Sequence, residues 1–294
     1  MDHMRILVPI SHTEGTDTAF DRALALARTS NAELYLVHAV PVDHPFSWHA
    51  AERRARWAEL RARAANAGVP VLTAEQHGDA ADVIVLHADA RAVDLIVIAT
   101  EGRTGWDRFP QPSVAERVVR RTTRPTLVVR DEGPGPVAFR NVLVAVDLSP
   151  ASKTLIERAK QVFGRDARQL TVLHAVNNIE AADAVWSHAR WVVPEYRAYV
   201  LSGARRRVEA MTPNTAGVSV QVHVAPGPTA DAIVARAAAV DADLIVVGRS
   251  KRVLRSGATA VRLLRDTDRA LLIVPPTAAG GAINPEESGF RRAA

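Results

Sequence analysis

The chain has 294 residues, of which 48% are hydrophobic and 23% are charged, and its formal net charge is +5. This length suits two domains of roughly 100–150 residues, each large enough to bury its own core. The absence of cysteine excludes disulfides, thiolate nucleophiles and zinc–thiolate sites. No apolar run reaches the roughly 18 residues of a membrane span, and the N-terminus lacks an export-signal pattern. We therefore expect a soluble, cytoplasmic protein.

The positive charge comes almost entirely from arginine, which supplies 34 of the 37 basic residues. The runs at 53–56 and 205–207 lie within helical patterns, beside alanine, glutamate and leucine. Such a composition favours solvent-exposed helix faces over a nucleic-acid footprint. We expect neither nucleic acid nor a membrane as a partner.

The first 130 residues alternate short apolar runs with amphipathic stretches. Strands are predicted at 4–10, 34–40, 70–74, 95–98 and 126–129, and helices near 20–27, 48–66, 80–90 and 113–121. Gly68 is expected to stop the second helix. Strands that alternate with helices indicate a doubly wound, five-stranded parallel sheet with helices on both faces.

The same pattern then recurs. RILVPIS returns as RNVLVAVD, VHAV as LHAV, and VDLIVIA as ADLIVVG. We predict a tandem repeat of two α/β domains at 4–130 and 140–276, a Gly/Pro linker at 131–139 and a disordered tail at 277–294. Leu7 and Leu143 lie 136 positions apart, but Leu95 and Leu244 lie 149 apart. The second copy has therefore gained 13 residues in its second helix region.

The inserted region carries four aromatic residues. We expect them to pack against the sheet or a partner, with a ligand lid as the alternative. They are Trp186, Trp191, Tyr196 and Tyr199.

Ligands of open parallel sheets bind outside the carboxyl ends of the strands. In the first copy this crevice is formed by Ser11, Ala39 and 99–113, and in the second by Asp147, Ala175 and 248–259. No nucleophile elbow, P-loop or G-x-G-x-x-G motif follows a strand. Because Asp147 has no positioned nucleophile or second acid beside it, we expect no catalytic residues and no enzyme.

The segments that build this crevice resemble a universal stress protein domain. In the first copy they are ILVPIS, LVHAV, DLIVIATEGRTGW and SVAERVVRRTTRPTLVVR; in the second they are NVLVAVDLS, VLHAV, DLIVVG and ALLIVPP. The resemblance covers nearly all of both copies. It implies five-stranded parallel domains, similar to adenine nucleotide alpha hydrolases, that pair through their fifth strands. In one branch of the family it also implies an ATP site.

That branch has an aspartate ending strand one, a backbone contact after the strand-two histidine, and a loop G-x2-G-x9-G-[S/T]. In the first copy the loop positions hold Ala99, Gly102, Pro112 and Ser113, and Ser11 replaces the aspartate. Proline at 112 removes an N–H that a phosphate would use. Ser113 fits a helix N-cap that forms a capping box with the glutamate at 116. We therefore do not expect a nucleotide here, although Gly102 and Ser113 match the pattern.

The second copy fits the branch better. Asp147 matches the carboxylate that contacts the ribose or adenine, and Ala175 offers its backbone. The loop keeps the outer glycines but is four residues shorter. Its predicted ligand contacts are Gly248, Arg249, Lys251, Gly257 and Thr259. Such a cationic loop suits a smaller anion, such as the phosphate of a mononucleotide. The alternative is that these are exposed loop charges and that Asp147 caps the helix at 150–163.

Two functions remain open. In the first, the protein is a stress-response module that binds ATP or another adenine nucleotide in its second copy. In the second, it is an interaction protein that acts through unknown protein partners. The two copies are expected to form an intramolecular pseudo-dimer, with a homodimer as a further option. Slow ATP hydrolysis is disfavoured by the missing glycines. We expect no metal site, because His38 and His174 lie inside strands, and His44 and His49 lack a partner ligand.

Overall fold

A computed structural model of the chain describes residues 4–11, 15–41, 50–100, 112–130, 139–163, 167–177, 193–212, 218–249 and 258–276. The first half contains β1 (Arg5–Pro9), α1 (Gly15–Ser30), β2 (Glu33–Val40), α2 (Ala50–Asn66), β3 (Val71–His77), α3 (Ala80–Ala90), β4 (Leu95–Thr100), α4 (Val114–Arg121) and β5 (Thr126–Arg130). The second half contains β6 (Asn141–Val146), α5 (Ala151–Phe163), β7 (Gln169–Val176), α7 (Val193–Met211), β8 (Ser219–Pro226), α8 (Thr229–Ala239), β9 (Leu244–Gly248), α9 (Ala258–Asp266) and β10 (Ala270–Val274). Most of the predicted linker and all of the predicted tail lie outside the described residues.

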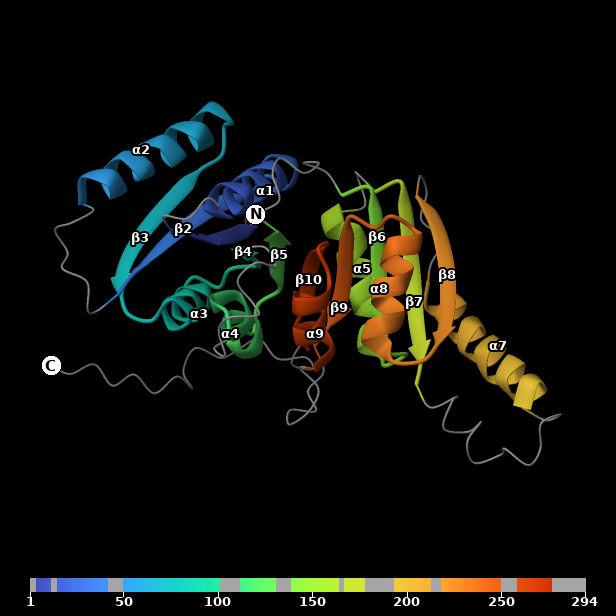
Figure 1. The fold of residues 1–294 in the computed structure, drawn as a ribbon. Helices are drawn as coiled ribbons and strands as arrows, with labels where there is room; N and C mark the ends of the chain where they lie inside the picture. Colours follow the sequence, from blue (N-terminus) through green and yellow to red (C-terminus); the bar gives the residue numbers. More distant parts are fainter. Residues whose placement is uncertain are drawn as a thin grey trace, which may run out of the picture.

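Each half has the predicted doubly wound α/β fold, with five parallel strands in the order 3-2-1-4-5. The two sheets are continuous, because β5 pairs antiparallel with β10 to give a ten-stranded sheet (Figure 1). Leu127 lies opposite its own repeat counterpart, Leu272. A local two-fold axis therefore passes through the centre of the sheet and relates the two halves.

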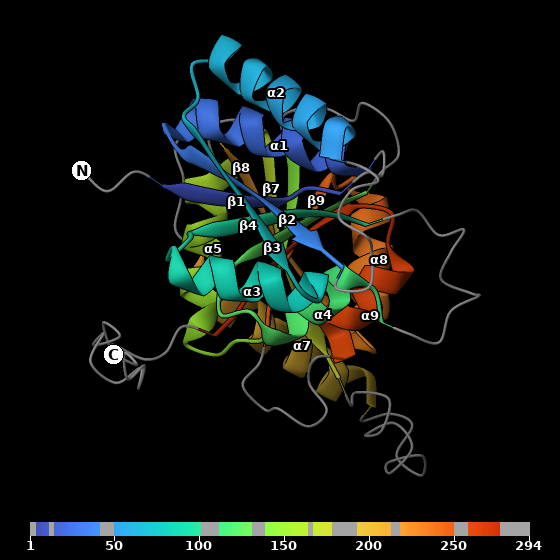
Figure 2. The ribbon, with the colours of Figure 1, turned by 90° about the vertical axis from the view of Figure 1, so that its left-hand side faces the viewer.

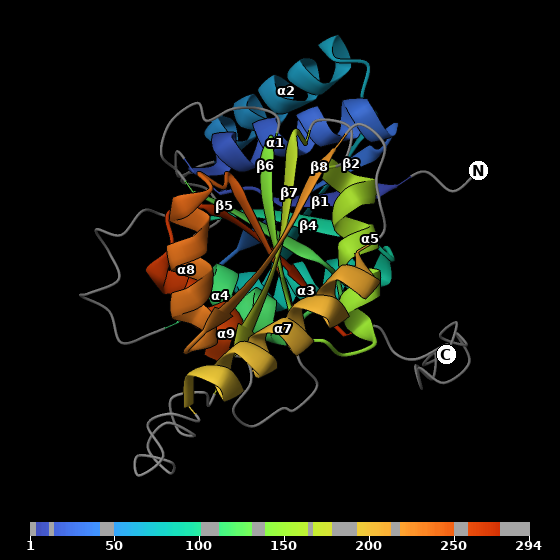
Figure 3. The same cartoon turned by 90° about the vertical axis from the view of Figure 1, so that its right-hand side faces the viewer.

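Helices cover both faces of this sheet. Buried residues of α1, α2, α5 and α7, such as Phe20 and Val208, form one apolar layer, and those of α3, α4, α8 and α9, such as Val118 and Leu263, form the other. Figure 2 shows the arrangement around the first half and Figure 3 that around the second. Each of the two apolar layers continues across the join between the halves, so the strands of both halves pack on the same two layers. Within the described residues, no helix is long and apolar enough to cross a membrane.

Two details depart from the sequence predictions. The third strand was predicted at 70–74 but continues to His77, because its polar end stays in register with His38 to Val40 of β2. In α7, Ala204 and Val208 pack against the core, whereas Tyr196 and Tyr199 are 50% and 72% exposed. The two tyrosines therefore do not pack against the sheet, and the other part of the prediction, that they pack against a partner, stays a prediction. Trp186 and Trp191 lie outside the described residues.

The halves also meet through a carboxylate near the local two-fold axis. Glu116 of α4 is fully buried. It accepts hydrogen bonds from Arg120 of its own helix at 2.7 Å and from Arg265 of α9 at 3.1 Å. These two arginines are repeat counterparts, 145 positions apart, while the counterpart of the glutamate is Val261. One carboxylate thus serves two symmetry-related cations.

Two further arginines cross between the halves. Arg130, which ends β5, donates to the carbonyls of Leu264 and Thr267 at the end of α9, the second of these at 2.6 Å. Arg249, which follows β9, donates to the carbonyls of Val119 and Thr122 at the end of α4. A cation at a helix C-terminus satisfies otherwise unpaired carbonyls and interacts favourably with the helix dipole. Each half therefore caps a helix of the other.

Candidate functional site

The end of strand one is tied to the following helix in both halves. In the second half, Asp147 Oδ1 accepts hydrogen bonds from the Ser149 amide and the Ser152 hydroxyl, both at 2.9 Å. In the first half, the counterparts Ser11 and Thr16 are joined hydroxyl to hydroxyl at 2.8 Å. The predicted alternative was that Asp147 caps the helix at 150–163. In the structure the Asp147 carboxylate accepts from the amide of Ser149, which precedes α5, and from the side chain of Ser152 in the first turn of α5.

The Asp147 carboxyl group is held in its ionised form. Partial burial raises the pKa of Asp147, but the hydrogen bonds from Ser149 and Ser152 outweigh burial, and the net effect is a lowered pKa. The neighbouring Leu148 adopts a left-handed conformation with φ of 61°, which costs a non-glycine residue roughly 1 kcal/mol. An exposed, charged oxygen pair is thus fixed at the carboxyl end of β6 by a strained turn.

The strand-two histidines have the same contact in both halves. His38 Nδ1 lies 2.8 Å from the Ile10 carbonyl, and His174 Nδ1 lies 2.8 Å from the Val146 carbonyl. Each histidine thereby bonds to the end of the neighbouring strand one. Ala39 and Ala175, which follow them, are partly buried at the same edge. Among the residues whose placement is described, no cluster of three or more metal-ligating side chains is present.

Gly248 ends β9, which pairs with β6 on the side opposite to β7. A Cβ atom built there would lie 3.8 Å from Leu155 Cδ2, an ordinary contact, and its φ is not in the left-handed region. The fold itself therefore does not require glycine, and its first-half counterpart is Ala99. The absence of a side chain leaves the backbone open to a ligand.

Arg249 contacts the first half, and the phosphate contact predicted for it stays a prediction. Its amide donates to the Val274 carbonyl at 2.7 Å, and its guanidinium donates to the end of α4, at 2.8 Å to Thr122. Burial lowers the pKa of this guanidinium. The amide of Arg249 is thus engaged within the second half, and its guanidinium is engaged with the first half. These bonds use two of the five N–H donors of the guanidinium.

The remaining predicted residues are only partly described. Thr259 lies in the first turn of α9 and is partly buried, whereas Gly102, Lys251 and Gly257 lie outside the described residues. Ser113 is the N-cap of α4, as predicted, since its hydroxyl accepts from the Glu116 amide at 3.1 Å. The other half of the predicted capping box is replaced, because the carboxylate of this glutamate accepts from Arg120 and Arg265.

The comparisons with known proteins agree with this geometry. The model of the universal stress protein family matches residues 3–130 and again residues 138–275. The chain belongs to this family. Its tandem arrangement confirms the prediction of two universal stress protein domains in one chain.

Similar proteins differ in how much of the chain they match. A universal stress protein of Methanocaldococcus jannaschii is 31% identical over 144 residues, which are 44% of this chain and 82% of that protein. A solved universal stress protein of Archaeoglobus fulgidus covers 92% of this chain and 98% of its own, with 17% identity and a TM-score of 0.68. Another from the same organism, solved in complex with dAMP, covers 44% and 98%, with 21% identity and a TM-score of 0.37. The dAMP belongs to that protein and decides nothing for this chain.

Proposed function

We propose that this universal stress protein is a cytoplasmic binding module for an adenine nucleotide or a related anion, and that the ligand occupies the second half. The observation that carries the proposal is Asp147, an ionised and exposed carboxylate fixed at the carboxyl end of β6. Carboxylate oxygens accept hydrogen bonds from ribose hydroxyls or an adenine amino group. In the first half the same position holds a neutral serine.

Two neighbouring strands complete the proposed site. Ala175 is the next-to-last residue of β7, the strand that pairs with β6, and offers backbone groups. Gly248 leaves the end of β9 without a side chain. Because Arg249 is engaged with α4, the phosphate would be held by Lys251, Gly257 and Thr259. A contact set this small suits a mononucleotide better than a triphosphate.

Binding is a better fit than catalysis. A general base works best when its pKa lies near the operating pH, whereas the pKa of Asp147 is lowered below its ordinary value. The carboxylate is therefore suited to holding a ligand and poorly suited to removing a proton. We propose that the protein is not an enzyme.

Calorimetry with AMP, ADP and ATP tests the proposal. Wild type should bind AMP at least as well as ATP. Asp147→Asn should weaken AMP binding about tenfold, which corresponds to one charged hydrogen bond of about 1.4 kcal/mol. Gly248→Ala should weaken it as well, although its Cβ fits the fold.

The first half supplies matched controls, Ser11→Ala and Ala99→Gly, which should leave the affinity within about twofold, since changes remote from a ligand rarely exceed 0.5 kcal/mol. Absence of heat with all three nucleotides would overturn the proposal. Equal losses from Ser11→Ala and Asp147→Asn would place the site elsewhere.

The alternative, an interaction protein, is favoured by the exposed Tyr196 and Tyr199 of α7, because tyrosine is enriched at protein interfaces. In that case no nucleotide would bind. Capture of a partner from a lysate would be lost in a Tyr196→Ser/Tyr199→Ser variant and retained in Asp147→Asn.

A further inference from the structure

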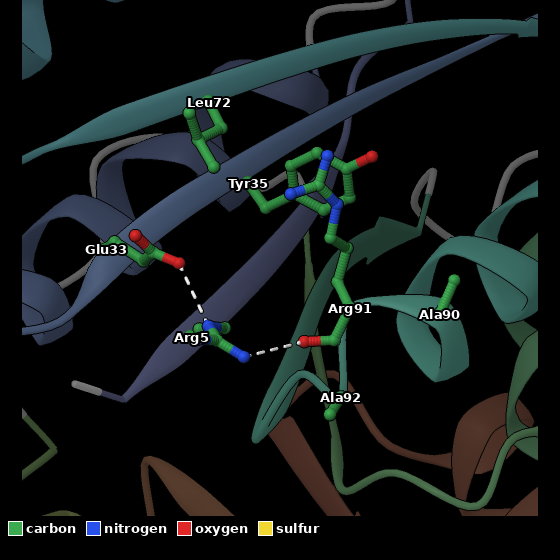
Figure 4. A pocket seen from close by; sticks show the side chains of 7 residues that line it. All are labelled: Arg5, Glu33, Tyr35, Leu72, Ala90, Arg91 and Ala92. Atoms are coloured by element: carbon green, nitrogen blue, oxygen red, sulfur yellow. Dashed lines mark hydrogen bonds and ion pairs between the residues drawn. The ribbon is translucent and has the colours of Figure 1, made fainter. Parts of the chain in front are cut away.

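A cavity of about 380 Å³ lies in the first half at the opposite end of the sheet from Ser11. Its walls come from the starts of β1, β2 and β3 and from the C-terminal end of α3 (Figure 4). The residues that line it are Arg5, Glu33, Tyr35, Leu72, Ala90, Arg91 and Ala92. Small-molecule sites typically enclose about 300–1,000 Å³, so a ligand of modest size fits here.

The aromatic wall of this cavity is fixed by a chain of hydrogen bonds. The buried Tyr35 places its hydroxyl 2.5 Å from His87 Nδ1, and His87 Nε2 lies 2.7 Å from Gln76 Oε1. Because the amide oxygen can only accept, Nε2 carries the proton and Nδ1 accepts from the tyrosine. Burial, followed by the charge of Arg91, lowers the pKa of His87, which agrees with this neutral ring. The wall is therefore ordered without a ligand.

The charged groups in the cavity are unequally engaged. Arg5 Nε lies 3.1 Å from Glu33 Oε1, and its Nη1 donates to the Arg91 carbonyl at 3.1 Å. The Arg91 guanidinium stacks 5.1 Å from the centre of the Tyr35 ring. Among the described residues it has no carboxylate partner. The lining thus carries two positive charges and one negative charge. Because Arg5 is paired with Glu33, Arg91 is the arginine positioned to bind an anion.

An apolar surface lies beside this cation. Leu72 is 45% exposed, and the alanines at 90 and 92 extend the surface on the side of α3. Figure 4 shows the Arg91 guanidinium over the ring of the tyrosine, and the leucine to the left of both. A ligand with one charged end and one apolar end matches this arrangement.

The second half shows that the fold does not need these residues. The counterparts of Arg5, Glu33, Tyr35, Leu72 and Arg91 are Asn141, Gln169, Thr171, Gln221 and Val240. The same strands and helix form there without either arginine, the tyrosine or the leucine. The fold therefore does not explain why these five residues occur together in the first half.

We propose that this cavity binds a small monocarboxylate with an apolar chain or ring, whose carboxylate pairs with Arg91 and whose apolar part lies on Leu72. The planar guanidinium binds carboxylates through two parallel hydrogen bonds. A phosphate dianion fits less well, because Glu33 leaves a net charge of only +1 in the cavity. This site is separate from the nucleotide site and does not depend on it.

Amide NMR spectra of the full-length chain, titrated with benzoate and hexanoate, test the proposal. Saturable shifts should be confined to residues 33–36, 71–73 and 90–93, with dissociation constants on the order of 1 mM, as expected for ligands of this size. Arg91→Gln should weaken both probes about tenfold, since one charge-assisted contact is lost. Leu72→Ser should weaken them less.

Matched probes and variants separate this site from general effects. Benzamide should give no saturable shifts, and inorganic phosphate should not compete. Arg54→Gln, which removes an exposed arginine of α2, should leave both affinities within about twofold. The proposal is overturned if Arg91→Gln binds as wild type does, if benzamide matches benzoate, or if phosphate binds more tightly at these residues. Saturating AMP should leave these shifts unchanged. A failure of the proposed carboxylate site can therefore be distinguished from a failure of the proposed nucleotide site.

Discussion

The ends of β1 and β6 perform the same structural task with different chemistry. In the first half, the hydroxyls of Ser11 and Thr16 connect the strand to the helix, whereas in the second half Asp147 and Ser152 do so with a carboxylate. Because neutral groups are sufficient in one copy, the fold does not explain the charge in the other. The comparison between the copies thus separates what the architecture requires from what a ligand would require.

The shared carboxylate between the halves should give the largest effect. Arg120→Ala combined with Arg265→Ala would leave the buried Glu116 without a cation, which should cost about 3–5 kcal/mol in free energy of unfolding. Each single change should cost about 1 kcal/mol or less, because the other arginine remains and both are roughly half exposed. Urea unfolding measures all three.

The matched control is Arg206→Ala combined with Arg207→Ala, two exposed arginines of α7, for which we expect less than about 0.5 kcal/mol. Strict additivity of the two single changes would show that the arginines do not share the glutamate.

The reciprocal helix caps should give intermediate and similar effects. Arg130→Ala and Arg249→Ala each remove two charged hydrogen bonds to helix carbonyls, and each should destabilise by about 1–2 kcal/mol. The comparison also tests the ligand assignment, because Arg249→Ala should leave the AMP affinity within about twofold. If AMP binding is lost in Arg249→Ala and kept in Arg130→Ala, Arg249 contacts the phosphate after all.

The smallest effect is a pH dependence that distinguishes the two strand ends. A carboxyl group whose folded pKa is lowered contributes stability above its unfolded pKa of about 3.9, and this is lost as the pH falls through the folded pKa. The difference in unfolding free energy between wild type and Asp147→Asn should therefore shrink between pH 5 and pH 3. Urea unfolding across this range measures it. Ser11→Ala should show a difference from wild type that does not vary with pH.

The fold was largely predictable because it rests on local patterns. Apolar runs such as 4–10 indicated strands buried on both faces, and Gly68 stops α2 with a left-handed φ of 69°. The third strand was predicted too short, because its end, Glu75 to His77, is polar and lies at the edge of the sheet. The apolar pattern of a sequence indicates which residues are buried. It therefore cannot indicate a strand that continues through polar residues that are not buried.

The candidate site was predictable only in part. Asp147 follows β6 and Gly248 ends β9, where the apolar runs before them place the carboxyl ends of the strands. The role of Arg249 depends on α4, about 130 positions earlier in the chain, and on how the two halves pack. The cavity of the first half likewise joins Tyr35 to Arg91, which are distant in sequence. Contacts of this kind leave no local pattern for a sequence to show.

The local two-fold axis between β5 and β10 has a consequence for how such a chain can evolve. In a dimer of identical subunits, any residue beside the axis meets a copy of itself, so a carboxylate there is always duplicated. Fusion of the two copies removes that constraint, and position 116 carries glutamate while position 261 carries valine. A duplicated gene can therefore place an odd number of charges on its own symmetry axis, which two separate identical chains cannot do.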